Sequence, residues 1–111
     1  MTRNPQDRIS DALTAIERCR LFNDQLKAEP ALTLMAEDAI ERNLQVLGEA
    51  VSHLPVEMTS RYPEVPWTQI RGFRNILVHQ YFSIDISVIR DVVENHLPQL
   101  EAALHCLADG K

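Results

Sequence analysis

The stretch that decides the fold reads Ile40-Glu41-Arg42-Asn43-Leu44-Gln45-Val46-Leu47-Gly48-Glu49-Ala50-Val51. Its large apolar side chains recur every three or four residues, at Ile40, Leu44, Leu47 and Val51, and then at Leu54. Because a helix turns once in about 3.6 residues, this spacing places them on one face, opposite Glu41, Gln45 and Glu49. We therefore predict an amphipathic helix that ends near Leu54, in which Gly48 marks a close approach of another helix.

The same spacing continues toward the N-terminus. Asn4 followed by Pro5 is a helix-start signal, and Pro30 interrupts the pattern that follows. The apolar residues between them are Ile9, Leu13, Ile16, Cys19, Phe22 and Leu26. This pattern predicts a first helix that runs to about Lys27.

Toward the C-terminus, prolines divide the chain. Pro55, Pro63 and Pro66 leave room for one short helix, from Val56 to about Tyr62, and then for an extended link. Pro66 is expected in the first turn of a third helix, whose buried face holds Trp67, Ile70, Phe73 and Leu77.

A fourth helix is predicted after Ser83 or Asp85, either of which can cap it, and Pro98 should kink or split it. Its apolar residues keep the helical spacing at Ile86, Ile89, Val93, Leu97, Leu100, Leu104 and Leu107. Four main helices with short connections, plus the short helix, predict an antiparallel all-α bundle.

The composition agrees with this fold. The 111 residues suit a single domain, 1–111, and they include only three Gly and 5% aromatic residues, too few for a sheet-rich protein. The polar N-terminus lacks the pattern of a signal peptide or membrane span, which predicts a cytoplasmic protein. Cys19 and Cys106 are expected to be buried thiols without a disulfide.

The charge pattern bears on possible partners. A net charge of −5 argues against nonspecific binding of nucleic acid, whose affinity comes mostly from basic residues. However, the segment from Val65 to Ile84 contains no acidic residue. The basic residues expected to form a cleft are Arg71, Arg74 and His79 within this segment, joined in space by Arg42 and Arg61.

The octapeptide Arg74-Asn75-Ile76-Leu77-Val78-His79-Gln80-Tyr81 is the candidate active site. Arginine holds a phosphate with a planar fork of donors, and histidine moves protons near neutral pH. On one helix Arg74 and His79 lie about 140° apart, so a single helix does not easily bring both to one phosphate. We expect the helix to end near His79 and a second copy to complete the site across a two-fold axis.

The predicted chemistry needs neither a metal nor a cofactor. The ribose 2′-OH would attack the adjacent phosphate while His79 moves a proton and Arg74 balances the charge of the transition state. Asn75 would orient His79 or contact the phosphate, Arg71 would assist with substrate, and Tyr81 would contact the substrate or present its hydroxyl to another enzyme.

The residues also allow a structural interpretation. His79 near a helix C-terminus interacts well with the helix dipole, Arg74 has Glu41 and Glu49 as possible ion-pair partners, and a tyrosine can anchor a corner. Three further histidines, His53, His96 and His105, are read as surface or interface residues because no two have metal-binding spacing. The acidic residues of the second helix, Glu37, Glu41 and Glu49, are read as a solvated face, with the alternative that Glu49 reaches the cleft.

Beyond these patterns, the octapeptide resembles the Arg-x4-His-x-Tyr signature of HepT-like toxins, a branch of the HEPN superfamily of helical ribonucleases. The resemblance extends to residues 39–50, to Pro66-Trp67 followed by Ile70, and to Leu97-Pro98-Gln99-Leu100. It therefore covers the chain from about Ile9 to Leu104. The chain is more compact than fuller family members, and Gln80 stands where an acidic residue is common.

The resemblance implies a function. Arg74 and His79 would form a metal-independent ribonuclease site at the interface of a homodimer, as the toxin of a toxin–antitoxin pair. Tyr81 would be the residue that a cognate minimal nucleotidyltransferase antitoxin, of the MntA type, modifies with AMP. Added adenylates bring bulk and negative charge to a cleft that must receive RNA phosphates, so the modification would switch the enzyme off.

Two other functions remain open from the sequence. One is a noncatalytic helical adaptor that binds a nucleotidyltransferase, or a nucleotide, through the same cleft. The other is a purely structural bundle in which Arg74 and His79 lie apart, each satisfied by its own helix.

Overall fold

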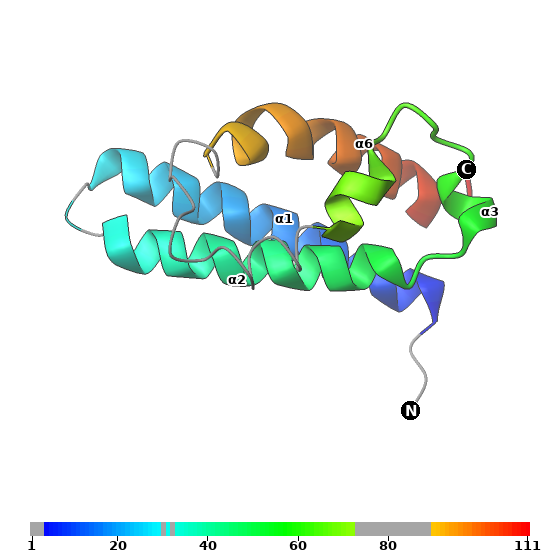
Figure 1. Cartoon of the computed structure of the whole chain (residues 1–111), viewed down its shortest axis with the longest axis horizontal. Helices are drawn as coiled ribbons and strands as arrows, with labels where there is room; N and C mark the ends of the chain where they lie inside the picture. Colours follow the sequence, from blue (N-terminus) through cyan, green and yellow to red (C-terminus); the bar gives the residue numbers. More distant parts are fainter. Residues whose placement is uncertain (1–3, 30, 32, 73–89) are drawn as a thin grey trace.

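The computed structural model describes residues 4–29, 31, 33–72 and 90–111. Every regular element within these ranges is a helix, so the predicted all-α fold is confirmed. The long helices α1 (Pro5–Ala28) and α2 (Thr33–Ser52) run antiparallel and side by side, and the C-terminal helical run lies along α1 (Figure 1). None of the described helices is both long enough and apolar enough to cross a bilayer.

Helix α1 begins where the sequence predicts. The Asn4 side chain accepts a hydrogen bond from the backbone N–H of Asp7 at 2.9 Å, and the Asp7 carboxylate accepts one from the Asn4 N–H at 3.4 Å. These reciprocal bonds form a capping box, and Pro5 occupies the first helical turn. The helix ends at Ala28, one residue beyond the predicted end.

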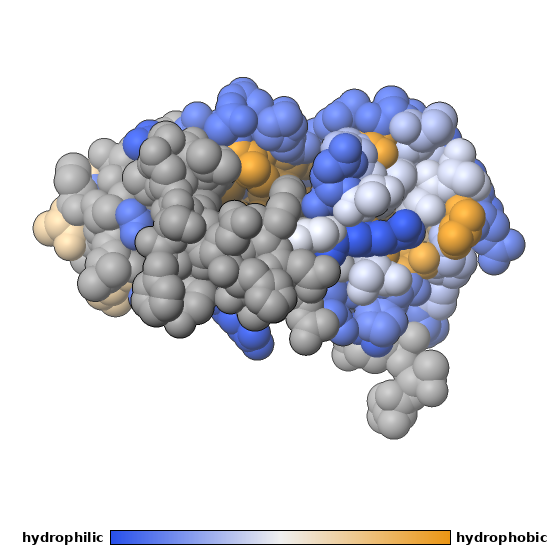
Figure 2. All heavy atoms as spheres, in the orientation of Figure 1, coloured by the Kyte–Doolittle hydropathy of each residue, from blue (hydrophilic) through white to orange (hydrophobic). Residues whose placement is uncertain are grey.

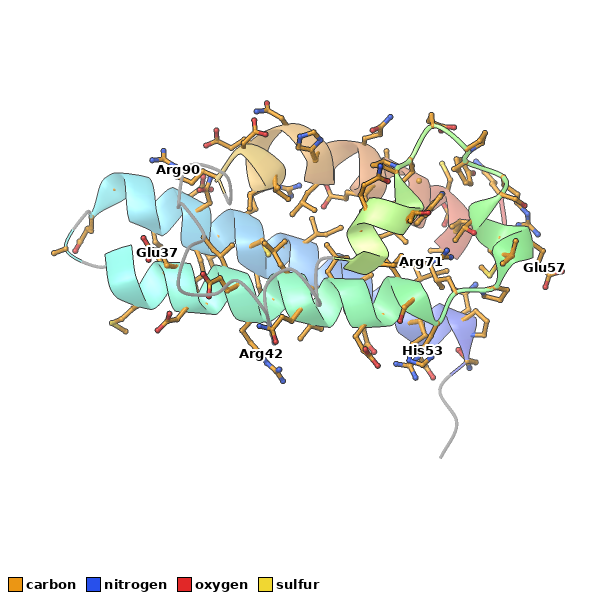
Figure 3. All side chains as sticks on the ribbon, viewed as in Figure 1. Glu37, Arg42, His53, Glu57, Arg71 and Arg90 are labelled. Carbon is orange, nitrogen blue, oxygen red and sulfur yellow. The ribbon has the colours of Figure 1, made fainter. Side chains whose placement is uncertain are left out.

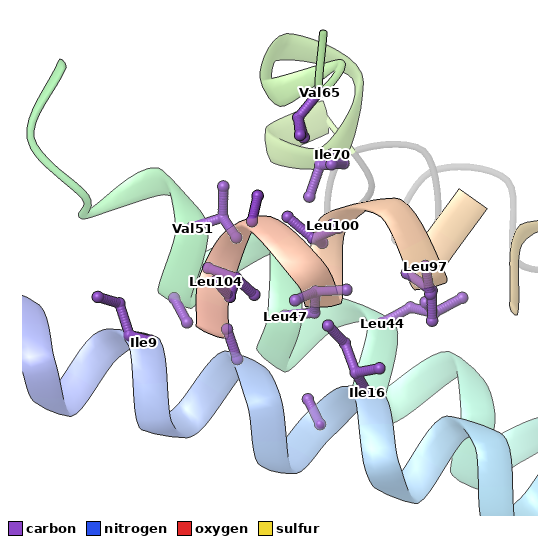
Figure 4. Packing of buried hydrophobic residues seen from close by; sticks show 14 of the residues in the cluster. Ile9, Ile16, Leu44, Leu47, Val51, Val65, Ile70, Leu97, Leu100 and Leu104 are labelled. Atoms are coloured by element: carbon purple, nitrogen blue, oxygen red, sulfur yellow. The ribbon is translucent and has the colours of Figure 1, made fainter. Parts of the chain in front are cut away.

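The core lies where α1, α2 and the C-terminal run meet (Figure 4). The apolar stripe of α2 is buried throughout, with Ile40, Leu47 and Val51 fully covered. The C-terminal run contributes Val93, Leu97, Leu100, Leu104 and Leu107, all of which were predicted to face inward. Gly48 is buried as well. The helical periodicity therefore identified the buried faces of these helices correctly.

The connection after α2 differs from the prediction. Helix α3 (Val56–Thr59) is shorter than expected, and turns replace the extended link. In these turns the Tyr62 N–H donates to the Thr59 carbonyl and the Val65 N–H donates to the Tyr62 carbonyl, each over 3.1 Å. The buried Trp67 explains the compact path, because its indole Nε1–H donates to the Tyr62 carbonyl at 2.9 Å. Helical structure resumes at 67–72, directly after Pro66.

The C-terminal run changes helix type at the predicted proline. A π-helix, η2 (Val92–His96), precedes α6 (Leu97–Ala108), and Pro98 lies in the first turn of α6. The Leu97 N–H bonds to the Val92 carbonyl, five residues back. Since Pro98 has no N–H to continue an α-helical ladder, a wider turn is a reasonable response to it. The predicted kink or split thus appears as a π-helical turn within a continuous run.

Polar contacts join this run to α1. The Arg20 guanidinium and the Glu101 carboxylate approach to 2.6 Å, and the Asn23 side-chain amide donates to Glu94 at 3.1 Å. Asn23 is almost fully buried, so its contact fixes η2 against α1 more firmly than a solvated pair would.

Both cysteines are free, as predicted. The Cys19 thiol is buried between α1 and α2, where its sulfur lies 3.8 Å from the Ile40 carbonyl oxygen, and burial raises its pKa to about 12. Cys106 is only half-buried, which corrects the expectation that both thiols are covered.

Candidate functional site

The octapeptide itself lies outside the described residues, which end at 72 and resume at 90. This applies to Arg74, Asn75, His79 and Tyr81, whose predicted roles therefore stay predictions. The structure does describe the helical turns that lead into this segment and the run that follows it. These flanking elements show how the fold holds the two ends of the candidate site.

The two ends are held at one side of the bundle. Trp67 and Ile70 anchor the helix that enters the segment, because both side chains are buried in the core. On the returning side, Val92 and Leu97 line the same apolar groove of about 310 Å³ as Pro66 and Ile70. The described residues before and after the octapeptide segment therefore lie at neighbouring positions on the bundle.

Arg71 is the one predicted site residue that the structure places. Its side chain is half-buried beside the C-terminal half of α2, as Figure 3 shows. Its Nε is covered by protein atoms and has no hydrogen-bond partner. A guanidinium is a strong donor of planar, paired hydrogen bonds. Arg71 therefore lies at the entrance to the octapeptide with donor capacity that the protein does not fully use.

The predicted basic cleft is described only in part, because Arg74 and His79 lie outside the described residues. Arg42 leaves α2 at the lower edge in Figure 3, well away from Arg71. Arg61 is exposed in the turn that follows α3. Sequence spacing does not determine which side of α2 the third helix covers, and that side decides which arginines can meet. Arg42 therefore does not lie beside Arg71, and its approach to Arg74 and His79 stays a prediction.

The acidic residues of α2 have two different environments. Burial raises the pKa of the Glu41 carboxyl, and the neighbouring charges of Asp38 and Glu37 raise it further. Glu49 forms an ion pair with His53, in which the carboxylate oxygen lies 3.1 Å from Nε2. Glu41 and Glu49 are both only half-exposed, so the interpretation of this face as fully solvated holds only in part.

The histidines outside the octapeptide are surface residues, as expected. His53, His96 and His105 are all exposed, and His96 lies 3.3 Å from the Asp91 carboxylate. Among the residues that the structure describes, no three His, Cys, Asp or Glu side chains are grouped so as to hold a metal ion. The described histidines thus act as exposed polar residues.

The sequence analysis missed a polar pocket between α1 and α2. Its volume is about 260 Å³, and it is lined by Arg8, Asp11, Arg42, Gln45, Val46, Glu49 and Ala50. The charged lining residues look like ordinary solvated helix positions in the sequence. The sequence does show one arginine on the polar side of each helix, Arg8 and Arg42. It does not show that both arginines line the same pocket.

The face shown in Figure 2 is mostly polar over the described residues, with small apolar patches between them. Among the described residues, the two most exposed large apolar side chains are Met35 at 72% and Val56 at 74%. Met35 lies in the first turn of α2 and Val56 begins α3, beyond the other end of α2, so they do not make one continuous apolar patch.

Comparison with known proteins points to one family. The family model described as "Ribonuclease HepT-like" matches residues 12–107. The match begins within α1 and ends within α6, so it includes the undescribed segment with the octapeptide. No solved structure matches the chain significantly.

Individual relatives carry related names. A Thermococcus cleftensis protein named "Probable ribonuclease HepT" is 30% identical over 102 residues, covering 91% of this chain and 93% of the relative. A Caldanaerobacter subterraneus subsp. tengcongensis protein named "Putative RNase TTE0752" is 38% identical over 80 residues, which are 72% of this chain and 67% of the relative. With "Putative RNase MJ0127" of Methanocaldococcus jannaschii, the identity is 42% over 62 residues, and the match spans 56% of this chain and about half, 51%, of the relative.

Proposed function

Because the chain belongs to the HepT-like ribonuclease family, we propose that it is an endoribonuclease that cleaves RNA without a metal ion. The observation that carries this proposal is the family match over residues 12–107, within which the chain has Arg74 and His79 at the spacing of the family signature. The placement of Arg71 at the entrance to this segment supports it further.

The proposed reaction is an internal transesterification. The ribose 2′ oxygen attacks the adjacent phosphorus as His79 accepts its proton, and the bond from phosphorus to the 5′ oxygen of the next nucleotide breaks. That 5′ oxygen takes up a proton and leaves, and a 2′,3′-cyclic phosphate remains. Arg74 neutralises charge that accumulates on the phosphate oxygens in the transition state.

Two neighbouring residues support this chemistry in the proposal. Asn75 is four residues before His79, so on a helix the two side chains are neighbours and the amide orients the imidazole. Arg71 binds a phosphate next to the one that is cleaved. Removing Arg71 should therefore raise KM more than it lowers kcat.

The site is proposed to be completed in a homodimer. On an ideal helix Arg74 and His79 point about 140° apart, so one copy does not easily direct both to the same phosphate. A two-fold axis places the same surface of both copies together and so supplies a second Arg74 and a second His79 to one groove.

Regulation is proposed to act through Tyr81, two residues after His79. A cognate minimal nucleotidyltransferase antitoxin would attach AMP to its hydroxyl, which makes the chain the toxin of a two-protein system. The attached phosphate would repel the phosphates of RNA, and the adenosine would occupy the groove. The unmodified protein is the active form in this proposal.

The decisive experiment is incubation of the purified chain with RNA in EDTA, with Tyr81 shown by mass spectrometry to be unmodified. We expect the parent to cleave RNA and His79→Ala and Arg74→Ala to lose activity by at least about a hundredfold. His105→Ala is the matched control, because this histidine is exposed on α6 and its removal should leave cleavage unchanged.

Retention of parental cleavage by a folded His79→Ala variant would refute the assignment of the active site. Absence of cleavage by the unmodified parent, together with tight binding of a nucleotidyltransferase, would instead support the noncatalytic adaptor.

A further inference from the structure

The polar pocket between α1 and α2 has the composition of a binding site. Arg8 comes from α1, and Arg42 and Gln45 come from α2, while Val46 and Ala50 supply an apolar wall. Figure 3 shows Arg42 extending from the edge of α2 that lies away from Arg71. Arg71 is not among the residues that line the pocket.

Neither arginine of this pocket forms an ion pair with another described residue. Among the described residues, the ion pairs join Arg20 to Glu101, His53 to Glu49 and His96 to Asp91, and none includes Arg8 or Arg42. The Nε of Arg8 is covered by protein atoms and has no hydrogen-bond acceptor. Two guanidinium groups that share one pocket without a paired carboxylate are suited to bind an anion from outside.

The other lining groups restrict what that anion is. Asp11 and Glu49 also line the pocket, and a simple anion such as free phosphate would be opposed by their negative charge. A carboxylate has about four acceptor positions, so each can accept a further hydrogen bond in addition to its contacts within the chain. The favoured ligand therefore carries an anionic group at one end and hydrogen-bond donors, next to an apolar surface, at the other.

From this combination we infer that the pocket binds a nucleoside monophosphate unit, either as a free nucleotide or as one nucleotide of an RNA strand. The phosphate lies against Arg8 and Arg42, the base lies on Val46 and Ala50, and ribose hydroxyls or a base amino group donate to Asp11 and Glu49. The volume of about 260 Å³ is near the lower limit for small-molecule sites, so it holds one such unit and not a longer ligand. The RNA form of this inference rests on the proposed function.

The first test is titration of the full chain with adenosine 5′-monophosphate, with adenosine and inorganic phosphate as separate ligands. Arg8→Gln and Arg42→Gln should each weaken binding of the nucleotide by about tenfold or more, because each removes a charge-assisted contact. Adenosine and phosphate alone should both bind more weakly than the nucleotide. Arg18→Gln is the control, since Arg18 is an exposed arginine of the same helix as Arg8 but does not line the pocket.

The second test uses a short RNA oligonucleotide and proteins that all carry His79→Ala, so that cleavage does not interfere. If the oligonucleotide binds, Arg42→Gln weakens this binding and the free nucleotide does not bind at all, then the ligand is one nucleotide of an RNA strand. If the free nucleotide binds and Arg42→Gln weakens this binding, then a free nucleotide is the ligand. Because both readouts measure binding, a chain that fails to cleave RNA would refute the proposed function without affecting this inference.

The inference is overturned if Arg8→Gln and Arg42→Gln, with circular dichroism and melting like those of the parent, bind both probes as tightly as Arg18→Gln does. It is also overturned if neither probe binds the parent at about millimolar concentration, or if Arg42→Gln converts a dimeric parent to a monomer. The last result would mean that the pocket is covered by a second copy of the chain.

Discussion

At the scale of single residues, Cys19 shows how burial changes the chemistry of a side chain. Its thiol lies between α1 and α2, 3.8 Å from the Ile40 carbonyl oxygen, and its pKa is raised from an ordinary value of 9.0 to about 12 because the thiolate would be poorly solvated there. Helical spacing predicted that Cys19 is buried. Cys106 was expected to be buried because it lies beside apolar helix positions, but it is only half-covered near the end of α6. Periodicity identifies a face but not how completely the neighbouring helices cover it.

The raised pKa of Cys19 predicts a pH dependence of stability. Between pH 9 and about 12 the unfolded chain loses the thiol proton and the folded chain keeps it, so the free energy of unfolding falls as the pH rises through this window. Chemical denaturation at a series of pH values should show a steeper fall for the parent than for Cys19→Ala. Leu21→Ala, at an exposed position on the same helix and without a titratable group, is the control and should keep the parental slope. Equal slopes for the parent and Cys19→Ala would contradict the prediction.

At the scale of single elements, the ends of the helices were predicted best where a local signal exists. Asn4 and Pro5 identified the start of α1 to the residue, because a capping box is made by side chains three residues apart. The end of α2 at Ser52 and the shortness of α3 have no such local signal. The turns between α3 and Trp67 depend on a contact from the indole to the Tyr62 carbonyl, which proline positions alone do not predict.

The capping box of α1 predicts a measurable cost of its removal. Asn4→Ala removes the acceptor for the Asp7 N–H and should lower the free energy of unfolding by about 1 kcal/mol. Asn4→Asp should retain most of the stability, because its carboxylate accepts the same bond. Gln99→Ala, at an exposed position on α6, serves as the control in thermal melts. A loss no larger than that of Gln99→Ala would show that the box contributes little.

At the scale of the whole molecule, α1, α2 and the C-terminal run share one core. The family match covers 12–107, and the described part of the chain agrees with the helical bundle that the sequence predicted. What the sequence did not predict is the pocket containing Arg8 and Arg42, since that site depends on how α1 and α2 are rotated against each other. Rotation between helices is a property of packing that neither helix determines by itself.

The shared core predicts that one deep truncation destabilises the whole molecule. Leu47 is fully buried, so Leu47→Ala should cost about 2–5 kcal/mol of the free energy of unfolding. Leu21→Ala is the matched control, because Leu21 is 53% exposed and its truncation should change stability by no more than about 0.5 kcal/mol. Denaturant titration measures both. Similar costs for the two variants would mean that the core is not organised around α2.

The proposed homodimer predicts that two inactive variants restore activity to each other. If Arg74 of one copy acts with His79 of the other, a mixed dimer of Arg74→Ala and His79→Ala contains one intact site. Random mixing makes half of the dimers mixed, so about a quarter of the parental activity should return. Mixing either variant with itself is the control. No recovery from subunits that are shown to exchange would mean that both residues act within one copy.

The π-helical turn at Val92–His96 determines how the residues that precede it in the C-terminal run are rotated about the helix axis. Such a turn contains one residue more than the α-helical path would need, and each residue corresponds to about 100° of rotation about the helix axis. Val93 and Leu97 are both buried, so with this turn the apolar sides of both parts of the run face the core. Loss of a single residue here would leave α6 in place but would turn Arg90, and the chain that arrives from the octapeptide, by more than a quarter of a circle.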